Sequence, residues 1–130
     1  RVFKGIFMEF HAVNELEEAL LLAMKGKLPH DQFLKILLKS DLFIPSGVDI
    51  VKSLREVQPV IYERDNLTMI AIYTDASRLK KLNELAPYCV QTNARAIFEA
   101  LDPDLGIVVN PGWPAGFELL PEDRKALLSE

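Results

Sequence analysis

Cysteine and histidine are scarce in this chain, which has one Cys and two His among 130 residues. The single thiol, Cys89, excludes an internal disulfide and a cysteine-based metal cluster. Because the sequence also has no HExxH or CxxC motif, it offers no set of metal ligands. A Cys–His nucleophile needs hydrogen-bond contact between its two side chains, and nothing in the pattern brings Cys89 to His11 or His30. We therefore predict a buried, structural Cys89 and no bound metal.

The chain also lacks long hydrophobic runs, excess positive charge and glycine-rich loops. Its longest apolar run, "ALLLAM" at 19–24, is far shorter than the roughly 20 residues of a transmembrane helix. The formal net charge is −4, so the chain lacks the general excess of positive charge that nucleic-acid binding requires. The six glycines are scattered, and "NPGWPAG" at 110–116 lacks the Lys-Ser/Thr of a phosphate-binding loop. These absences predict a protein that binds neither membranes nor nucleic acid and carries no cofactor.

Carboxylates gather most clearly at Glu15, Glu17 and Glu18. General acid–base catalysis needs carboxylates that converge on a cleft. These three are explained by the favourable interaction of negative charge with the positive end of a helix. The pattern therefore contains neither a nucleophile with its base nor a converging acid–base pair, and we expect a protein that is not an enzyme.

What the chain has in quantity is apolar residues, which make up 49% of it, beside 26% charged residues. This balance suits one compact globular domain with a real core. No repeat, low-complexity tract or linker divides the sequence, so we assign residues 13–130 to this domain and residues 1–12 to an N-terminal extension. Because the chain does not begin with Met, we hypothesise that residues 1–7 are either non-native or upstream of a start at Met8.

Hydrophobic periodicity and capping residues predict the secondary structure. Helices are expected over 14–25, 30–39, 76–85 and 94–101, and from 121 onward. Strands are expected over 42–44, 59–64, 67–74, 88–90, 106–109 and 116–119. The stretch 48–58 fits either a short helix or an irregular crossing. Asn14, with Glu17 three residues on, is a candidate cap of the first helix, whose inward face should include Leu16, Leu20 and Met24.

The two strands within 59–74 indicate how the domain is layered. Asp65 and Asn66 separate them and tolerate the left-handed conformation of a tight hairpin turn. The second strand, 67–74, has apolar residues on both faces, so we expect it to be central and covered on both sides, by helices or by helices and a loop layer. The sequence predicts an α/β fold, with mixed α+β as the variant, in which helices pack around a central mixed sheet.

Polar residues follow two of the expected strands. Thr74 and Asp75 end the second hairpin strand, and Asn110 and Gly112 follow the strand over 106–109. Because ligands of open α/β sheets gather at the carboxyl ends of strands, these four residues are candidate binding residues.

The only tryptophan, Trp113, stands between Gly112 and Pro114 on a turn with two prolines. Tryptophan is enriched at interaction hot spots, and prolines lower the entropy lost when a loop is ordered. Trp113 either anchors a partner or folds back to cap the core, and the two roles are compatible.

Six motifs follow one another along the chain: "NELEEALLLA", "LLKSDLFIPSG", "IAIYTDASRL", "NARAIFEAL", "GIVVNPG" and "GFELLPEDRKAL". Their order and spacing resemble the N-terminal domain of the SseB family over about residues 13–128. The resemblance implies a bacterial, cytoplasmic α/β domain, which is followed by a second domain in many members. The family has no established catalytic residues, so positions such as Asn14, Thr74 and Asn110 carry over as fold markers only.

The resemblance and the missing catalytic groups favour a non-enzymatic interaction or regulatory module. The family is named for enhanced serine sensitivity, which suggests a link to serine or sulfur amino-acid metabolism through a protein partner, with a sulfurtransferase as one candidate. A homo-oligomer is also compatible with the sequence. The alternative is a small-molecule sensor whose pocket lies between the strand ends at Thr74-Asp75 and Asn110-Trp113.

Overall fold

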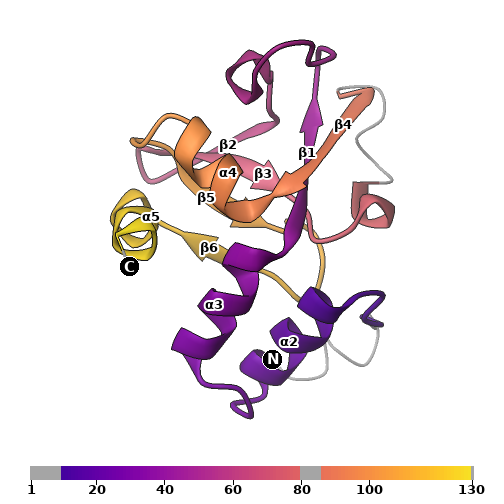
Figure 1. Cartoon of the computed structure of the whole chain (residues 1–130), viewed down its shortest axis with the longest axis vertical. Coiled ribbons are helices and arrows are strands. Elements are labelled where there is room, and N and C mark those ends of the chain that lie inside the picture. The colour runs from indigo at the N-terminus through magenta and orange to yellow at the C-terminus, as the bar shows by residue number, and fades with distance from the viewer. Residues whose placement is uncertain (1–9, 80–85, 130) are drawn as a thin grey trace.

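Two β-sheets organise residues 10–79 and 86–129, which are the parts of the chain described by the computed structural model (Figure 1). The larger sheet contains, in spatial order, β2 (Ile61–Arg64), β3 (Leu67–Ile72), β5 (Gly106–Val109) and β6 (Phe117–Leu119). Its two central strands, β3 and β5, are parallel, and each outer strand is antiparallel to its neighbour. The smaller sheet is an antiparallel ribbon of β1 (Asp41–Ser46) and β4 (Tyr88–Asn93). The predicted mixed sheet and mixed fold class are confirmed.

The four α-helices contribute to the main core, on one face of the larger sheet. The α-helices of the described residues are α2 (Glu15–Met24), α3 (His30–Lys39), α4 (Ala94–Ala100) and α5 (Pro121–Leu128), and the short 3-10 helices are η1 (Leu54–Glu56) and η2 (Ala76–Leu79). In Figure 1, α2 and α3 lie together at the lower end, and the β1–β4 ribbon rises at the opposite end. None of these helices has the length and apolarity needed to cross a membrane.

The first helix begins and ends where its capping residues predict. The side chain of Asn14 accepts a hydrogen bond from the backbone N–H of Glu17 at 2.8 Å, which satisfies one of the free donors of the first turn. The Glu17 side chain bonds the N–H of Val13 at 3.0 Å, one residue before the cap. Gly26 follows the helix with φ 74°, the left-handed conformation that commonly ends helices.

The predicted hairpin is also confirmed. Asp65 and Asn66 have φ 52° and 65°, as a two-residue turn of type I′ requires. The turn fixes the register between β2 and β3. As expected from its two apolar faces, β3 is an interior strand, flanked by β2 and β5.

The two faces of the larger sheet are covered differently. One face buries Ile70, Ile72 and Ile107 in the main core, to which α2, α3, α4 and α5 all contribute. The opposite face carries a smaller cluster in which Ala71 and Tyr73 pack with residues of η2 and of the loop that follows β5. The sheet therefore lies between a layer of helices and a layer of loops, as the sequence suggested.

The structure differs from two local predictions and shows the form of the stretch that the sequence left open. Met24, expected to face inward, is 53% exposed at the last residue of α2, whereas the preceding Ala23 packs against the core. The helix expected over 76–85 is a 3-10 turn over Ala76–Leu79, and residues 80–85 lie outside the described part. The open stretch 48–58 contains η1, which a capping box of Ser53 and Glu56 stabilises.

Candidate functional site

The two predicted strand ends meet in the structure. Thr74 follows β3 and Asn110 follows β5, and because these strands are parallel neighbours their carboxyl ends lie side by side. The Asn110 side chain accepts from the N–H of Thr74 at 3.0 Å, and its amide donates to the Thr74 hydroxyl at 2.8 Å and to the carbonyl of Ala115 at 3.1 Å. Both residues are almost completely buried.

A buried ion pair completes this polar cluster. Arg78 of η2 donates from Nε to Glu17 Oε2 at 2.9 Å and from Nη2 to Oε1 at 2.6 Å. The hydroxyl of Thr74 donates to Glu17 Oε2 at 2.5 Å, and Glu17 has no exposed surface. Burial raises the pKa of the Glu17 carboxyl, but the hydrogen bonds from Arg78, Thr74 and the Val13 N–H outweigh it and leave the pKa below its ordinary value.

Trp113 packs inward onto this ion pair. Its indole N–H donates to the backbone carbonyl of Arg78 at 2.9 Å. The guanidinium of Arg78 lies 4.6 Å from the Trp113 ring centre and 3.9 Å from that of Phe10, which is cation–π geometry. Of the two roles that the sequence leaves open for Trp113, the structure shows the inward one: the ring is half-buried and covers the smaller hydrophobic cluster.

The turn between Asn110 and Trp113 aims the indole at Arg78. The N–H of Trp113 donates to the carbonyl of Asn110 at 3.1 Å, which closes a four-residue turn. Pro111 in the second position and Gly112, with φ 84°, in the third are the signature of a type II turn. Asn110 itself has φ 56°, a conformation that Asn tolerates better than most residues. Gly112 is exposed and contacts no other part of the site.

This cluster is chemically saturated. The Glu17 carboxylate accepts four hydrogen bonds, from Arg78 twice, Thr74 and Val13, and so has no lone pair oriented toward a substrate. The strand ends that the sequence marks as a candidate pocket are therefore filled by the protein's own side chains. Sequence reasoning missed Glu17 and Arg78; the only signal was a Glu adjacent to the apolar stripe of its helix.

Asp75 differs from its neighbours because it reaches the surface. It lines a polar depression of about 480 Å³, together with residues from the start of α2, the α3–β1 junction and β4: Asn14, Lys39, Asp41 and Gln91. Its carboxylate also accepts from the N–H and hydroxyl of Ser77 at 3.0 and 2.6 Å. Burial raises the pKa of Asp75, but the hydrogen bonds from Ser77 and Asn14 and the charge of Arg78 outweigh this effect and leave the pKa below its usual value.

The prediction of a buried Cys89 is wrong, because the residue is exposed. It lies opposite Pro45 near the start of β4, on a face of the two-stranded ribbon that the described residues leave exposed. Desolvation of the thiol and the negative charge of Asp75 raise its pKa, so the thiol is not activated as a nucleophile. Among the described residues, no group of three or more His, Cys, Asp or Glu is placed to hold a metal ion.

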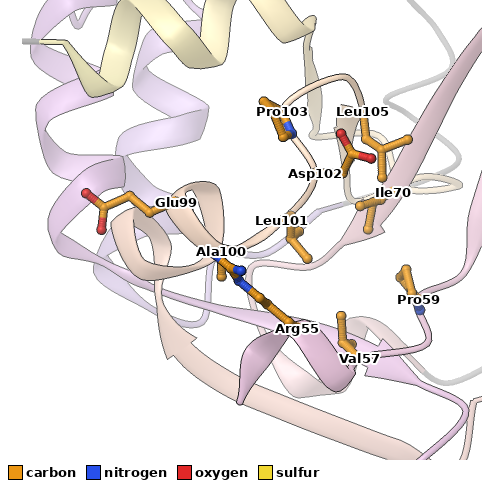
Figure 2. A pocket seen from close by; sticks show the side chains of 10 residues that line it. All are labelled: Arg55, Val57, Pro59, Ile70, Glu99, Ala100, Leu101, Asp102, Pro103 and Leu105. Carbon is orange, nitrogen blue, oxygen red and sulfur yellow. The ribbon is translucent and has the colours of Figure 1, made fainter.

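A second concave region lies away from these residues, between η1 and the end of α4 (Figure 2). This groove has a volume of about 490 Å³ and the following lining: Arg55, Val57, Pro59, Ile70, Glu99, Ala100, Leu101, Asp102, Pro103 and Leu105. Figure 2 shows Val57 and Pro59 on one wall, Pro103 and Leu105 on the opposite one, and Ile70 and Leu101 between them. No pattern in the sequence indicated this groove.

A family profile described as the SseB protein N-terminal domain matches residues 16–123 of the chain. The match contains both the polar cluster and the groove, and it confirms the resemblance seen in the order of the motifs. No curated protein and no solved structure matches the chain.

Proposed function

The chain belongs to the SseB family through its N-terminal domain, and from this premise we propose that it is a protein-interaction module rather than an enzyme. The observation that carries the proposal is the groove between η1 and α4. Its lining combines an apolar floor with charged residues at the edge, which is the usual composition of a protein-binding surface.

The chemistry of the groove favours binding over catalysis. The ionisable residues of its lining are Arg55, Glu99 and Asp102, and the lining includes no thiol, hydroxyl or imidazole. Catalysis by acids and bases needs groups held in mutual hydrogen-bond reach. The fold does bury the Glu17 carboxylate, but this group is held in an ion pair with Arg78 and is not free to act as an acid or base.

Selection from a library of random short peptides displayed on phage tests this proposal. We expect enrichment of peptides whose binding is lost in an Ala100→Trp variant, because an indole at this half-buried position of the lining fills the groove. Ala23→Trp, at a half-buried position of α2 outside the groove, is the matched control and should keep binding. Equal melting temperatures of the two variants would show that both fold. Failure to enrich any sequence that the Ala100→Trp variant loses would refute the proposal.

The family name directs the first search for a natural partner. We propose that the partner belongs to serine or sulfur amino-acid metabolism, in the cytoplasm, and that a sulfurtransferase is the first candidate to measure. Binding of a purified sulfurtransferase to the wild-type chain, and its loss in the Ala100→Trp variant, would support this choice. Equal binding by both proteins would place the contact elsewhere.

A small-molecule sensor is the second candidate function, and the polar depression beside Asp75 is the observation that favours it. A zwitterion such as an amino acid could place its ammonium near Asp41 and Asp75 and its carboxylate near Lys39. Thermal-shift measurements against amino acids and nucleotides test this idea. A rise in melting temperature that Asp75→Ala abolishes would support the sensor, and the absence of any ligand-dependent shift would remove it.

A further inference from the structure

On its outer side, the strand β2 carries backbone groups that have no hydrogen-bond partner among residues 10–79 and 86–129. The carbonyl of Val60 accepts from Ala71 of β3 at 2.9 Å, and in an antiparallel pair the residues that point toward the partner strand alternate. The N–H and C=O groups of Ile61 and Glu63 must therefore point away from β3. All residues of β2 are exposed, and β2 is the terminal strand of its sheet. Such an edge is a template for pairing with another chain.

The groove begins beside this edge. Ile61 lies directly opposite Ile70 in the β2–β3 pair, so the two side chains stand next to each other on the same face of the sheet. Ile70 is fully buried and forms part of the groove lining, whereas Ile61 is 51% exposed. The apolar surface thus continues from the groove to the edge strand.

Both walls of the groove are held in place before any partner binds. The buried guanidinium of Arg124 donates to four carbonyls at the end of α4 and in the following loop, those of Phe98, Leu101, Asp102 and Leu105. On the other wall, the Glu56 carboxylate accepts from three successive backbone N–H groups of residues 51–53. Preorganised walls lower the entropy that binding costs.

The charges around the groove are predominantly negative. Glu63 follows Ile61 by two residues and lies on the same face of β2, because strand side chains alternate between faces. Glu99 and Asp102 add two carboxylates to the lining, against one cation from Arg55. Two further cations lie close by, but Arg124 is buried beneath the wall, and Arg64 pairs with Glu118 through hydrogen bonds of 2.5 and 2.6 Å.

We propose that this surface binds an extended peptide that adds a strand to β2. The peptide backbone pairs with Ile61 and Glu63, one apolar side chain enters the groove beside Ile61, and a Lys or Arg two residues away lies opposite Glu63. This inference rests on the proposed interaction function and specifies its ligand, since strand addition takes affinity from backbone hydrogen bonds and specificity from alternate side chains.

The test uses the whole chain and a synthetic peptide with an apolar–x–Lys sequence taken from the display selection. Amide hydrogen exchange followed by NMR should show new protection at Ile61 and Glu63. The amides of Tyr62 and Arg64, which face β3, are the internal control and should change little. Methylating the peptide nitrogens that face β2 should weaken binding roughly 10-fold or more, because about 1 kcal/mol is lost for each hydrogen bond.

Charge reversal supplies an independent readout. Glu63→Lys should weaken binding of the Lys peptide roughly three- to tenfold and improve binding of the same peptide with Glu in place of Lys. Glu18→Lys, an equal change of charge on an exposed position of α2, should leave both affinities nearly unchanged. Peptides that bind through the groove but tolerate nitrogen methylation and leave Ile61 and Glu63 unprotected would overturn strand addition while the interaction function stands. Failure of every peptide to bind would overturn both.

Discussion

Replacing Arg78 by Met should destabilise the domain more than any comparable change of a surface charge. Arg78 is 9% exposed and Glu17 is fully buried. The substitution keeps an apolar side chain of similar length but removes both hydrogen bonds from the guanidinium to the Glu17 carboxylate. It also removes the cation that lies between the rings of Phe10 and Trp113. Glu17 would then remain as a buried charge with only Thr74 and Val13 as partners.

The expected loss is about 3–5 kcal/mol, the usual range when one partner of a buried ion pair is removed. Small domains have a total unfolding free energy of about 5–15 kcal/mol, so this single change removes a large part of it. For a chain of this size, the melting temperature should fall by roughly 10–20 °C. The matched control is Arg64→Met, which breaks the exposed pair with Glu118 and should have a far smaller effect, because solvent screens exposed pairs.

Urea denaturation provides the measurement, followed by far-UV circular dichroism and by the fluorescence of Trp113, the only tryptophan. A second substitution separates the buried charge from lost packing. Glu17→Gln in the Arg78→Met background removes the uncompensated carboxylate, so the double variant should recover part of the loss. If Arg78→Met is no more harmful than Arg64→Met, or if the second change brings no recovery, the reasoning about the buried pair is refuted.

Three further predictions concern the same region. The folded-state pKa of Glu17 lies below the reference value of 4.5. Its contribution to stability is therefore present above pH 4.5 and is lost as the pH falls through the folded pKa. Acid titration of wild type and Glu17→Gln should show that their difference in unfolding free energy shrinks below pH 4.5. Trp113→Phe keeps a ring over Arg78 but loses the indole hydrogen bond, and circular dichroism during urea unfolding should show a loss of about 1–3 kcal/mol; an unchanged unfolding free energy would contradict the inward packing of Trp113. Cys89 should react fully with iodoacetamide in the native state. The rate should rise with pH because the thiolate reacts, and should keep rising above the range of an ordinary thiol because the pKa of Cys89 is raised; a thiol that reacts only after denaturation would contradict its exposure.

Local signals in the sequence were sufficient for most of the fold. Asn14 and Gly26 mark the two ends of α2, and the Asp65-Asn66 pair fixes a hairpin, because in each case the physical cause lies within a few residues of its effect. The exposure of Cys89 could not be predicted in this way. An apolar stretch predicts burial whatever its place in the fold. The environment of Cys89, however, depends on the pairing of β4 with β1, which lies more than 40 residues earlier in the sequence.

The same limit applies to the candidate site. Thr74 and Asn110 could be placed together, because the ends of neighbouring parallel strands must meet. The ion pair could not be predicted, since 61 residues separate Glu17 from Arg78 and the helix dipole already gives Glu17 a local explanation. The groove could not be predicted either, because its walls come from segments around 55–59 and 99–105, which lie at least 40 residues apart in the sequence.

The position of the ion pair bears on where this domain can bind its ligand. In open α/β sheets the crevice at the carboxyl ends of the strands is normally the ligand site. Here Glu17 and Arg78 occupy that position: Arg78 donates to Glu17, Glu17 accepts from the Thr74 hydroxyl, and Asn110 bonds Thr74 and Ala115. A ligand entering there would have to separate a buried pair, with a penalty of several kcal/mol. The edge of β2 has no such penalty, because the outward backbone groups of Ile61 and Glu63 are already hydrated and exchange water for a peptide at little cost. The same buried cluster that stabilises the fold therefore favours recognition at the open edge of the sheet.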